Sequence, residues 1–234
     1  MSQIPITPAF LRSHIYWPLA AFLVVLLTIE VGGLDLKLAD LIYSVSGNSW
    51  SLRSAWITND LIHEGGRNLV GIGALLLLGL WLSSCFLARL KPWRKGWLFI
   101  LVTACLAALS INILKRLTHT DCPWDLLRYG GSEPYVELFS ALPSGKEPGA
   151  CFPAGHASAG WSWFALYYWA MEYADRWRKP MLFAVLLAGF VFGASQQLRG
   201  AHFISHDLWT VALCWFLTTG LYLGFFHSPY LEEP

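Results

Sequence analysis

Charged residues are scarce in this chain. Only 13% of its 234 residues are Asp, Glu, Lys or Arg, whereas about a quarter are charged in a typical soluble domain. The chain also lacks any run of basic residues outside short loops, and its net charge is +1, so nothing points to nucleic acid as a partner. Hydrophobic residues make up 56% of the chain, and 13 residues are Trp. This composition excludes an ordinary soluble domain and predicts an integral membrane protein.

Six mostly apolar stretches are each long enough to cross about 30 Å of hydrocarbon as a helix. They lie at residues 15–34, 68–89, 96–114, 157–173, 181–198 and 207–226. No repeat or low-complexity stretch divides the chain. We therefore expect an all-α fold, a six-helix transmembrane bundle that forms a single domain over residues 1–234.

Basic residues in two short loops predict the orientation of this bundle. They are Arg89, Lys91, Arg94 and Lys95 between the second and third spans, and Arg176, Arg178 and Lys179 between the fourth and fifth. Because positive charge near span ends stays in the cytoplasm, both termini are expected there, in a multi-pass protein of the bacterial inner (plasma) membrane. The first span is too long for a signal-peptide core and no small-x-small cleavage site follows it, so we expect it to be retained.

Two polar segments are expected at the outer face. Residues 35–67 are too polar to span, but apolar residues at helical spacing, such as Leu38, Leu41 and Val45, predict a helix lying at the interface. The turn into the second span then carries His63, Glu64 and Arg67, which can overhang an outward site. The proline-rich loop 115–156 is expected to form an ordered lid rather than a long helix.

Cysteine is sparse, with five residues in the chain. Cys122 and Cys151 fall in the outward loop, and outward compartments are oxidising in most cells. Pairing cannot be deduced from sequence alone, so a Cys122–Cys151 disulfide and two separate thiols both remain open.

Three polar clusters lie where apolar spans end, all on the expected outer side. They are Lys115-Arg116 with His119, the tetrad Pro153-Ala154-Gly155-His156, and Arg199 with His202, His206 and Asp207. Ionisable groups are costly near hydrocarbon, so their convergence indicates a functional site. The alternative interpretation is that they are span-end anchors, which explains Lys and Arg well but explains the histidines poorly.

Each cluster has features that suit phosphate chemistry. A proline and Gly155 ahead of a helix leave backbone N–H groups free to bind an anion, and His156 has a near-neutral pKa suited to proton transfer. A nucleophilic His202 needs a partner for its second ring nitrogen, and both His206 and Asp207 lie about one helical turn away. Lys115, Arg116 and His119 supply cations for a phosphate.

Taken together, these motifs resemble the type 2 phosphatidic acid phosphatase superfamily over about residues 100–225. The matching residues are Lys115 with Cys122-Pro123, then Pro153-Ala154-Gly155-His156, then Ser195-Gln196 with His202. The family motifs read Lys-x6-Arg-Pro, Pro-Ser-Gly-His and Ser-Arg-x5-His-x3-Asp, in a six-span bundle. The resemblance implies that His202 is a nucleophile forming a phosphohistidine, that His156 is the acid and then the base, and that Lys115 binds phosphate oxygens.

The chain departs from this pattern at four positions. Cys122 replaces the first arginine, Ala154 the serine, Gln196 the second arginine and His206 the aspartate. Each lost charged hydrogen bond is worth roughly 1.5–3 kcal/mol, so other groups must compensate. The candidates are Arg67, Arg116, His119 and Arg199, with Asp207 or His206 orienting His202. Because both catalytic histidines persist, we expect an active site rather than a binding-only homologue.

The expected function is hydrolysis of a phospholipid or isoprenoid-lipid phosphate or diphosphate at the periplasmic face, without cofactor or metal. A close variant is phosphotransfer to a second lipid. A metal-dependent hydrolase is a further alternative, with His202 and His206 as ligands and Asp207 or His119 completing the set. The remaining alternative is that the chain is a non-catalytic lipid-binding membrane protein. The lipid and the oligomeric state are left open.

Overall fold

The structure, a computed structural model, describes residues 6–138, 140, 145 and 148–227. In these residues the regular structure is helical, with an isolated bridge between Leu126 and Glu133. The α-helices are α1 (Pro8–Leu11), α2 (Trp17–Gly32), α3 (Leu34–Val45), α4 (Gly66–Phe86), α5 (Arg94–Thr118), α6 (Gly155–Trp161), α7 (Ala165–Tyr173), α8 (Arg178–Leu198) and α9 (Ile204–His227). Shorter π-helical turns cover Arg12–Tyr16 and Ile57–Gly65.

Five helical stretches of the described residues are long and apolar enough to cross a membrane. They are Pro8–Gly32, Ile57–Phe86, Ala88–Asp125, Asp175–Leu198 and Ile204–His227. Large apolar side chains such as Leu75 and Phe190 are exposed on their outer faces, as expected where helices meet lipid. The chain is therefore a multi-pass membrane protein, and five of the six expected spans coincide with these helices.

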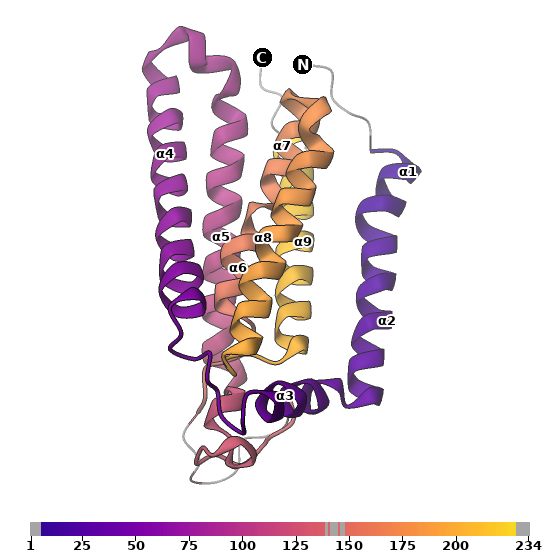
Figure 1. Ribbon diagram of the computed structural model, residues 1–234. Coiled ribbons are helices and arrows are strands. Elements are labelled where there is room, and N and C mark those ends of the chain that lie inside the picture. Colours follow the sequence, from indigo (N-terminus) through magenta and orange to yellow (C-terminus); the bar gives the residue numbers. More distant parts are fainter. Residues whose placement is uncertain (1–5, 139, 141–144, 146–147, 228–234) are drawn as a thin grey trace.

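The sixth expected span, residues 157–173, is not a continuous apolar helix. Here α6 and α7 are separated by a 3-10 turn at Ser162–Phe164. Both helices pack against α5, α8 and α9 in the middle of the bundle (Figure 1), and Phe164 and Tyr168 are fully buried. Because this segment faces protein rather than lipid, it carries the small, polar and aromatic residues of a protein core.

Small residues on α8 let its neighbours approach closely. A Cβ on Gly160 of α6 would lie 2.5 Å from the backbone of Gly189, and a Cβ on Gly193 would lie 2.9 Å from the Asp207 carboxylate of α9. Close backbone contacts of this kind are typical of helix packing in membranes. They hold α6 and the first turn of α9 against α8.

The helix expected from apolar spacing in residues 35–67 is α3. It lies across the end of the bundle where α9 begins, whereas the α4–α5 turn lies at the opposite end (Figure 1). The end of α5, the start of α6 and the start of α9, which carry the three polar clusters, meet at the end covered by α3.

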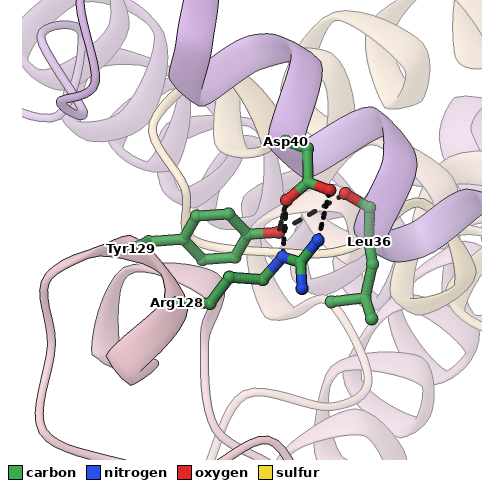
Figure 2. A network of polar contacts seen from close by, with 4 residues as sticks. All are labelled: Leu36, Asp40, Arg128 and Tyr129. Atoms are coloured by element: carbon green, nitrogen blue, oxygen red, sulfur yellow. Dashed lines mark hydrogen bonds and ion pairs between the residues drawn. The ribbon is translucent and has the colours of Figure 1, made fainter.

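A polar network attaches the loop after α5 to α3 (Figure 2). Arg128 donates from Nε and Nη2 to the two carboxylate oxygens of Asp40, each at 2.6 Å, and the Tyr129 hydroxyl donates to Asp40 at 3.0 Å. The hydrogen bonds from Arg128 hold the pKa of Asp40 below its usual range. Because the ion pair is exposed, it contributes only about 0–1 kcal/mol. The Tyr129 ring, buried against Tyr43 and Trp50, supplies apolar contact beside it.

Asp35 on α3 caps α9 from outside that helix. Its Oδ1 accepts a hydrogen bond from the Ser205 backbone N–H at 2.9 Å, and its Oδ2 accepts one from the Ser205 hydroxyl at 2.5 Å. Because α9 begins at Ile204, this N–H belongs to the first turn, where helix donors lack intrahelical acceptors. Asp35 thus satisfies a buried donor and ties α3 to the start of α9.

We expect Asp35→Ala to lower the free energy of unfolding by about 1–2 kcal/mol, as for the loss of a helix cap. Thermal unfolding of the purified protein in detergent measures the change. Asp35→Asn retains an oxygen that can accept from the Ser205 N–H, so its loss should be smaller. Equal unfolding temperatures for wild type and Asp35→Ala would show that this cap does not stabilise the bundle.

Candidate active site

His202 lies at the centre of the polar end of the bundle, in the connection between α8 and α9. It is only 5% exposed. Its pKa is well below the usual histidine value, first because of burial and then because of the nearby charges of His206, Lys115 and His156. His202 is therefore a neutral imidazole, and residues from α5, α6 and α9 surround it.

The His206 ring lies against His202, which also has a hydrogen bond to the Cys151 backbone. The two Nδ1 atoms lie 3.4 Å apart, and both rings are buried. Two neutral imidazoles in this arrangement share one proton between the facing nitrogens. When His202 carries that proton on Nδ1, its Nε2 keeps a free lone pair, as a nucleophile requires.

The Asp207 side chain lies against α8 rather than against His202. Its Oδ2 accepts a hydrogen bond from Gln197 Nε2 at 2.5 Å, and its carboxylate lies beside Gly193 of α8. The sequence left His206 and Asp207 open as partners of His202. The structure places His206 against His202 and Asp207 against α8, so His206 is the residue in position to orient the imidazole.

His156, in the first turn of α6, is stacked on His63 from the π-helical turn before α4. Their ring centroids lie 3.7 Å apart with an interplanar angle of 27°. His63, Lys115, Arg199 and Arg67 all interact electrostatically with His156. The turn expected to overhang the site therefore does contact it, through His63, while Arg67 is exposed at its edge.

Gly155 leaves room for Lys115 beside the start of α6. A Cβ on Gly155 would lie 3.0 Å from Cε and 3.1 Å from Nζ of Lys115. The ammonium group therefore lies directly over the turn that carries His156. This places the positive charge next to both catalytic candidates.

Arg199 is buried at the end of α8 and holds the chain before α4. Its Nε donates to the Arg53 carbonyl at 2.9 Å, its Nη2 to Asn59 Oδ1 at 2.7 Å and its Nη1 to Gln196 Oε1 at 3.3 Å. Gln196 occupies the position where the resembled family has an arginine, and Arg199 follows it by three residues. The guanidinium thus reaches the same side of the helix from about one turn further along.

Two sequence candidates are not brought into this cluster. Arg116 is exposed on α5, and because consecutive helical residues point in different directions, it diverges from Lys115. His119 ends α5 in a left-handed conformation with φ of 53°. It is exposed and lines a polar groove with Thr120 and Glu137.

Cys122 and Cys151 form a disulfide, with their Cα atoms 5.2 Å apart. The Cys151 backbone N–H also donates to the Thr120 carbonyl at 2.8 Å. The Cys151 sulfur lies 3.5 Å from Nδ1 of His202. The disulfide therefore packs directly against the candidate nucleophile and joins the segment that follows α5 to the segment that precedes α6.

The ligand atoms of Cys151, His202 and His206 lie within 4.8 Å of one another. With the sulfur engaged in the disulfide, this group offers only two imidazoles, and zinc sites generally use three or four protein ligands. Asp207 and His119, which the metal-dependent alternative would need, lie elsewhere. The geometry does not favour a resident catalytic metal.

Asn59 and Arg53 contact Arg199 although no motif in the sequence marks them, and Gln196 contacts it from a motif position. Asn59 is separated from Arg199 by 140 positions, and no local pattern links them. Gln196 had a signal, since it stands at a motif position, but its hydrogen bond to Arg199 depends on how α8 ends.

Comparison with models of protein families gives a match over more than half of the chain. A family model described as PAP2 superfamily matches residues 96–229, from the start of α5 through α9. The matched region contains Lys115, His156 and His202. No curated protein and no solved structure matches the chain.

The disulfide predicts a specific alkylation pattern. Without reduction, denatured protein should be labelled at Cys85, Cys105 and Cys214 but not at Cys122 or Cys151. Reduction before labelling should expose all five cysteines. Peptide mass spectrometry distinguishes the two patterns, and labelling of Cys151 without reductant would contradict the disulfide.

Proposed function

The chain belongs to the PAP2 superfamily, and we propose that it is a membrane phosphatase that hydrolyses a lipid phosphate or diphosphate through a phosphohistidine on His202. Membership in this superfamily supports phosphatase activity. The observation that carries the proposed mechanism is the convergence of His202, His206, His156 and Lys115 at one end of the bundle. The lipid substrate and the covalent intermediate are parts of this proposal.

In the first step, Nε2 of His202 attacks phosphorus while Nδ1 keeps its proton toward His206. The Nδ1 contact of 3.4 Å supports this assignment, because it leaves Nε2 as the nitrogen free to react. A neutral His206 in the place of an aspartate orients the ring but provides less stabilisation for a positively charged His202. Burial of both rings keeps them in this geometry.

His156 acts as the proton donor to the leaving alcohol, in the protonated form that the negative charge of a bound phosphate favours, and then as the base that activates water. Its position at the start of α6 and its electrostatic interaction with His202 support this role. The His63 ring stacked on it restricts its orientation. Two protonated imidazoles at this distance would repel each other, so His63 also favours return of the proton from His156.

Lys115 and Arg199 hold the phosphate. Lys115 Nζ lies over Gly155, so its charge is directed at the turn that carries His156. Three donor nitrogens of Arg199 already have acceptors, but a guanidinium has five N–H groups. The two that remain are available for a phosphate oxygen, in place of the arginine missing at Gln196.

The site faces outward, at the end of the bundle covered by α3. Arg94 and Arg178 begin α5 and α8 at the opposite end (Figure 1), and positive charge near span ends favours the cytoplasmic side. If α6 and α7 together form a sixth crossing, the start of α1 and the end of α9 both lie on the cytoplasmic side. We assign the bilayer to a bacterial inner membrane, in which the headgroup of an outer-leaflet lipid reaches the site while its tails remain in hydrocarbon.

Phosphate release from a panel of lipid phosphates and diphosphates tests this proposal. The panel includes phosphatidic acid, phosphatidylglycerol phosphate, undecaprenyl diphosphate and lipid A. His202→Ala should reduce release by about 1,000-fold or more, and His156→Ala by about 100-fold or more. His227→Ala, at the opposite end of α9, is a matched control that should retain wild-type activity. Activity that survives His202→Ala would refute the mechanism, and wild type inactive on the whole panel would favour a non-catalytic role.

Transfer to a second lipid instead of water is distinguished by the fate of the phosphate. With a radiolabelled phosphate donor, hydrolysis releases label as free phosphate. Retention of label in a second lipid would identify phosphotransfer by the same histidines.

Arg199→Lys should lower kcat/KM by about 10- to 150-fold, because a charged hydrogen bond to phosphate is worth roughly 1.5–3 kcal/mol. Lysine keeps the charge but cannot make the same set of directed hydrogen bonds. Arg116→Lys is the matched control, since Arg116 is exposed outside the cluster, and kcat/KM should stay within about twofold of wild type. Equal losses in the two variants would exclude a specific role for Arg199.

A further inference from the structure

The Cys122–Cys151 disulfide engages the sulfur of Cys151, which together with His202 and His206 forms a group of three possible metal ligands. Cys151 Sγ lies 3.5 Å from His202 Nδ1, and His202 Nδ1 lies 3.4 Å from His206 Nδ1. All three ligand atoms are within 4.8 Å of one another, and all three residues are buried. We propose that reduction of this disulfide converts the group into a zinc site, which zinc ions occupy at the expense of catalysis.

The distances suit zinc. Bonds of about 2.3 Å to sulfur and 2.0–2.1 Å to nitrogen in a tetrahedron place neighbouring ligand atoms about 3.3–3.6 Å apart. The Cys151–His202 and His202–His206 separations already have these values. The Cys151–His206 pair, within 4.8 Å, needs only a small closing movement.

The ligand types also select the metal. One thiolate and two imidazoles form a soft donor set that suits zinc and does not suit magnesium or calcium. Three protein ligands leave a fourth position for water, as in many open zinc sites. A bound ion would lie on the Nδ1 side of His202, away from the proposed phosphate.

A reductant can reach one sulfur of the disulfide more easily than the other. Cys151 is fully buried, whereas Cys122 is half-buried. A dithiol reductant therefore attacks the Cys122 sulfur, and the S–S bond breaks with Cys151 leaving as a thiolate beside the two imidazoles. The second thiol of the reductant then releases Cys122 and closes a cyclic disulfide. The reductant loses two electrons and two protons, and the two cysteines gain both. When zinc binds, Cys151 coordinates it as a thiolate and its proton passes to solvent.

Zinc would stop the proposed reaction by fixing the wrong tautomer, a consequence that rests on the proposed function. Coordination through Nδ1 moves the His202 proton to Nε2. Nε2 then has no lone pair to attack phosphorus. The reduced protein should therefore be a phosphatase in the absence of zinc and inactive in its presence.

A pair of variants tests the site without any assay of activity. Cys122→Ser and Cys151→Ser break the same disulfide, but only Cys122→Ser leaves the Cys151 thiol in place. After incubation with zinc and gel filtration, Cys122→Ser should retain one more zinc per chain than Cys151→Ser, as measured by elemental analysis. The remaining cysteines give the same background in both variants. Cobalt in place of zinc should give a sulfur-to-cobalt charge-transfer absorption in Cys122→Ser alone.

Wild-type protein provides a second measurement that needs no substitution. The oxidised form should retain no zinc above the Cys151→Ser background, and the form reduced with a phosphine should retain one zinc per chain. Equal zinc content in Cys122→Ser and Cys151→Ser, or in oxidised and reduced wild type, would overturn the proposal. If zinc binds as expected but no lipid phosphate is hydrolysed, the metal site stands and the phosphatase proposal fails. If hydrolysis occurs without thiol-dependent zinc binding, the phosphatase proposal stands and the metal site fails.

Discussion

The structure depends on satisfying buried polar groups at the end of an apolar bundle. An unpartnered polar group is costly to bury, and this end buries several within a few residues of one another. Three of them have partners on different elements: Ser205 on α3, Asp207 on α8, and Arg199 on the chain before α4. These contacts hold α3, α8 and α9 in one arrangement, and His202 lies within it.

The same constraint explains how the site departs from the family pattern. The sequence lacks two arginines and one aspartate of the motifs, so charges of both signs are missing. In a buried site, a charge without its partner is destabilising, and the combined loss removes charges of both signs from the surroundings of His202. His206 then supplies a neutral partner, the Cys122–Cys151 disulfide fills the first arginine position, and Arg199 brings a guanidinium back with Gln196 as its acceptor.

Close helix packing makes this convergence possible. Gly189 and Gly193 let α6 and α9 approach α8 along one face. The segment that carries His156 is central and enclosed by other helices, so it needs no continuous apolar surface. Its Ser162–Phe164 turn interrupts the helix where a lipid-facing span would be regular.

The amino-acid sequence by itself determined the membrane-embedded helical fold, five of the spans and the three polar clusters, because hydrophobic length and the placement of charge are local properties. It also marked His156 and His202 through their motifs. Only the tertiary structure decided that His206 rather than Asp207 lies against His202, that His63 stacks on His156, and which elements hold Arg199. Those outcomes depend on helix rotation and on contacts between residues far apart in the chain, which no local spacing specifies.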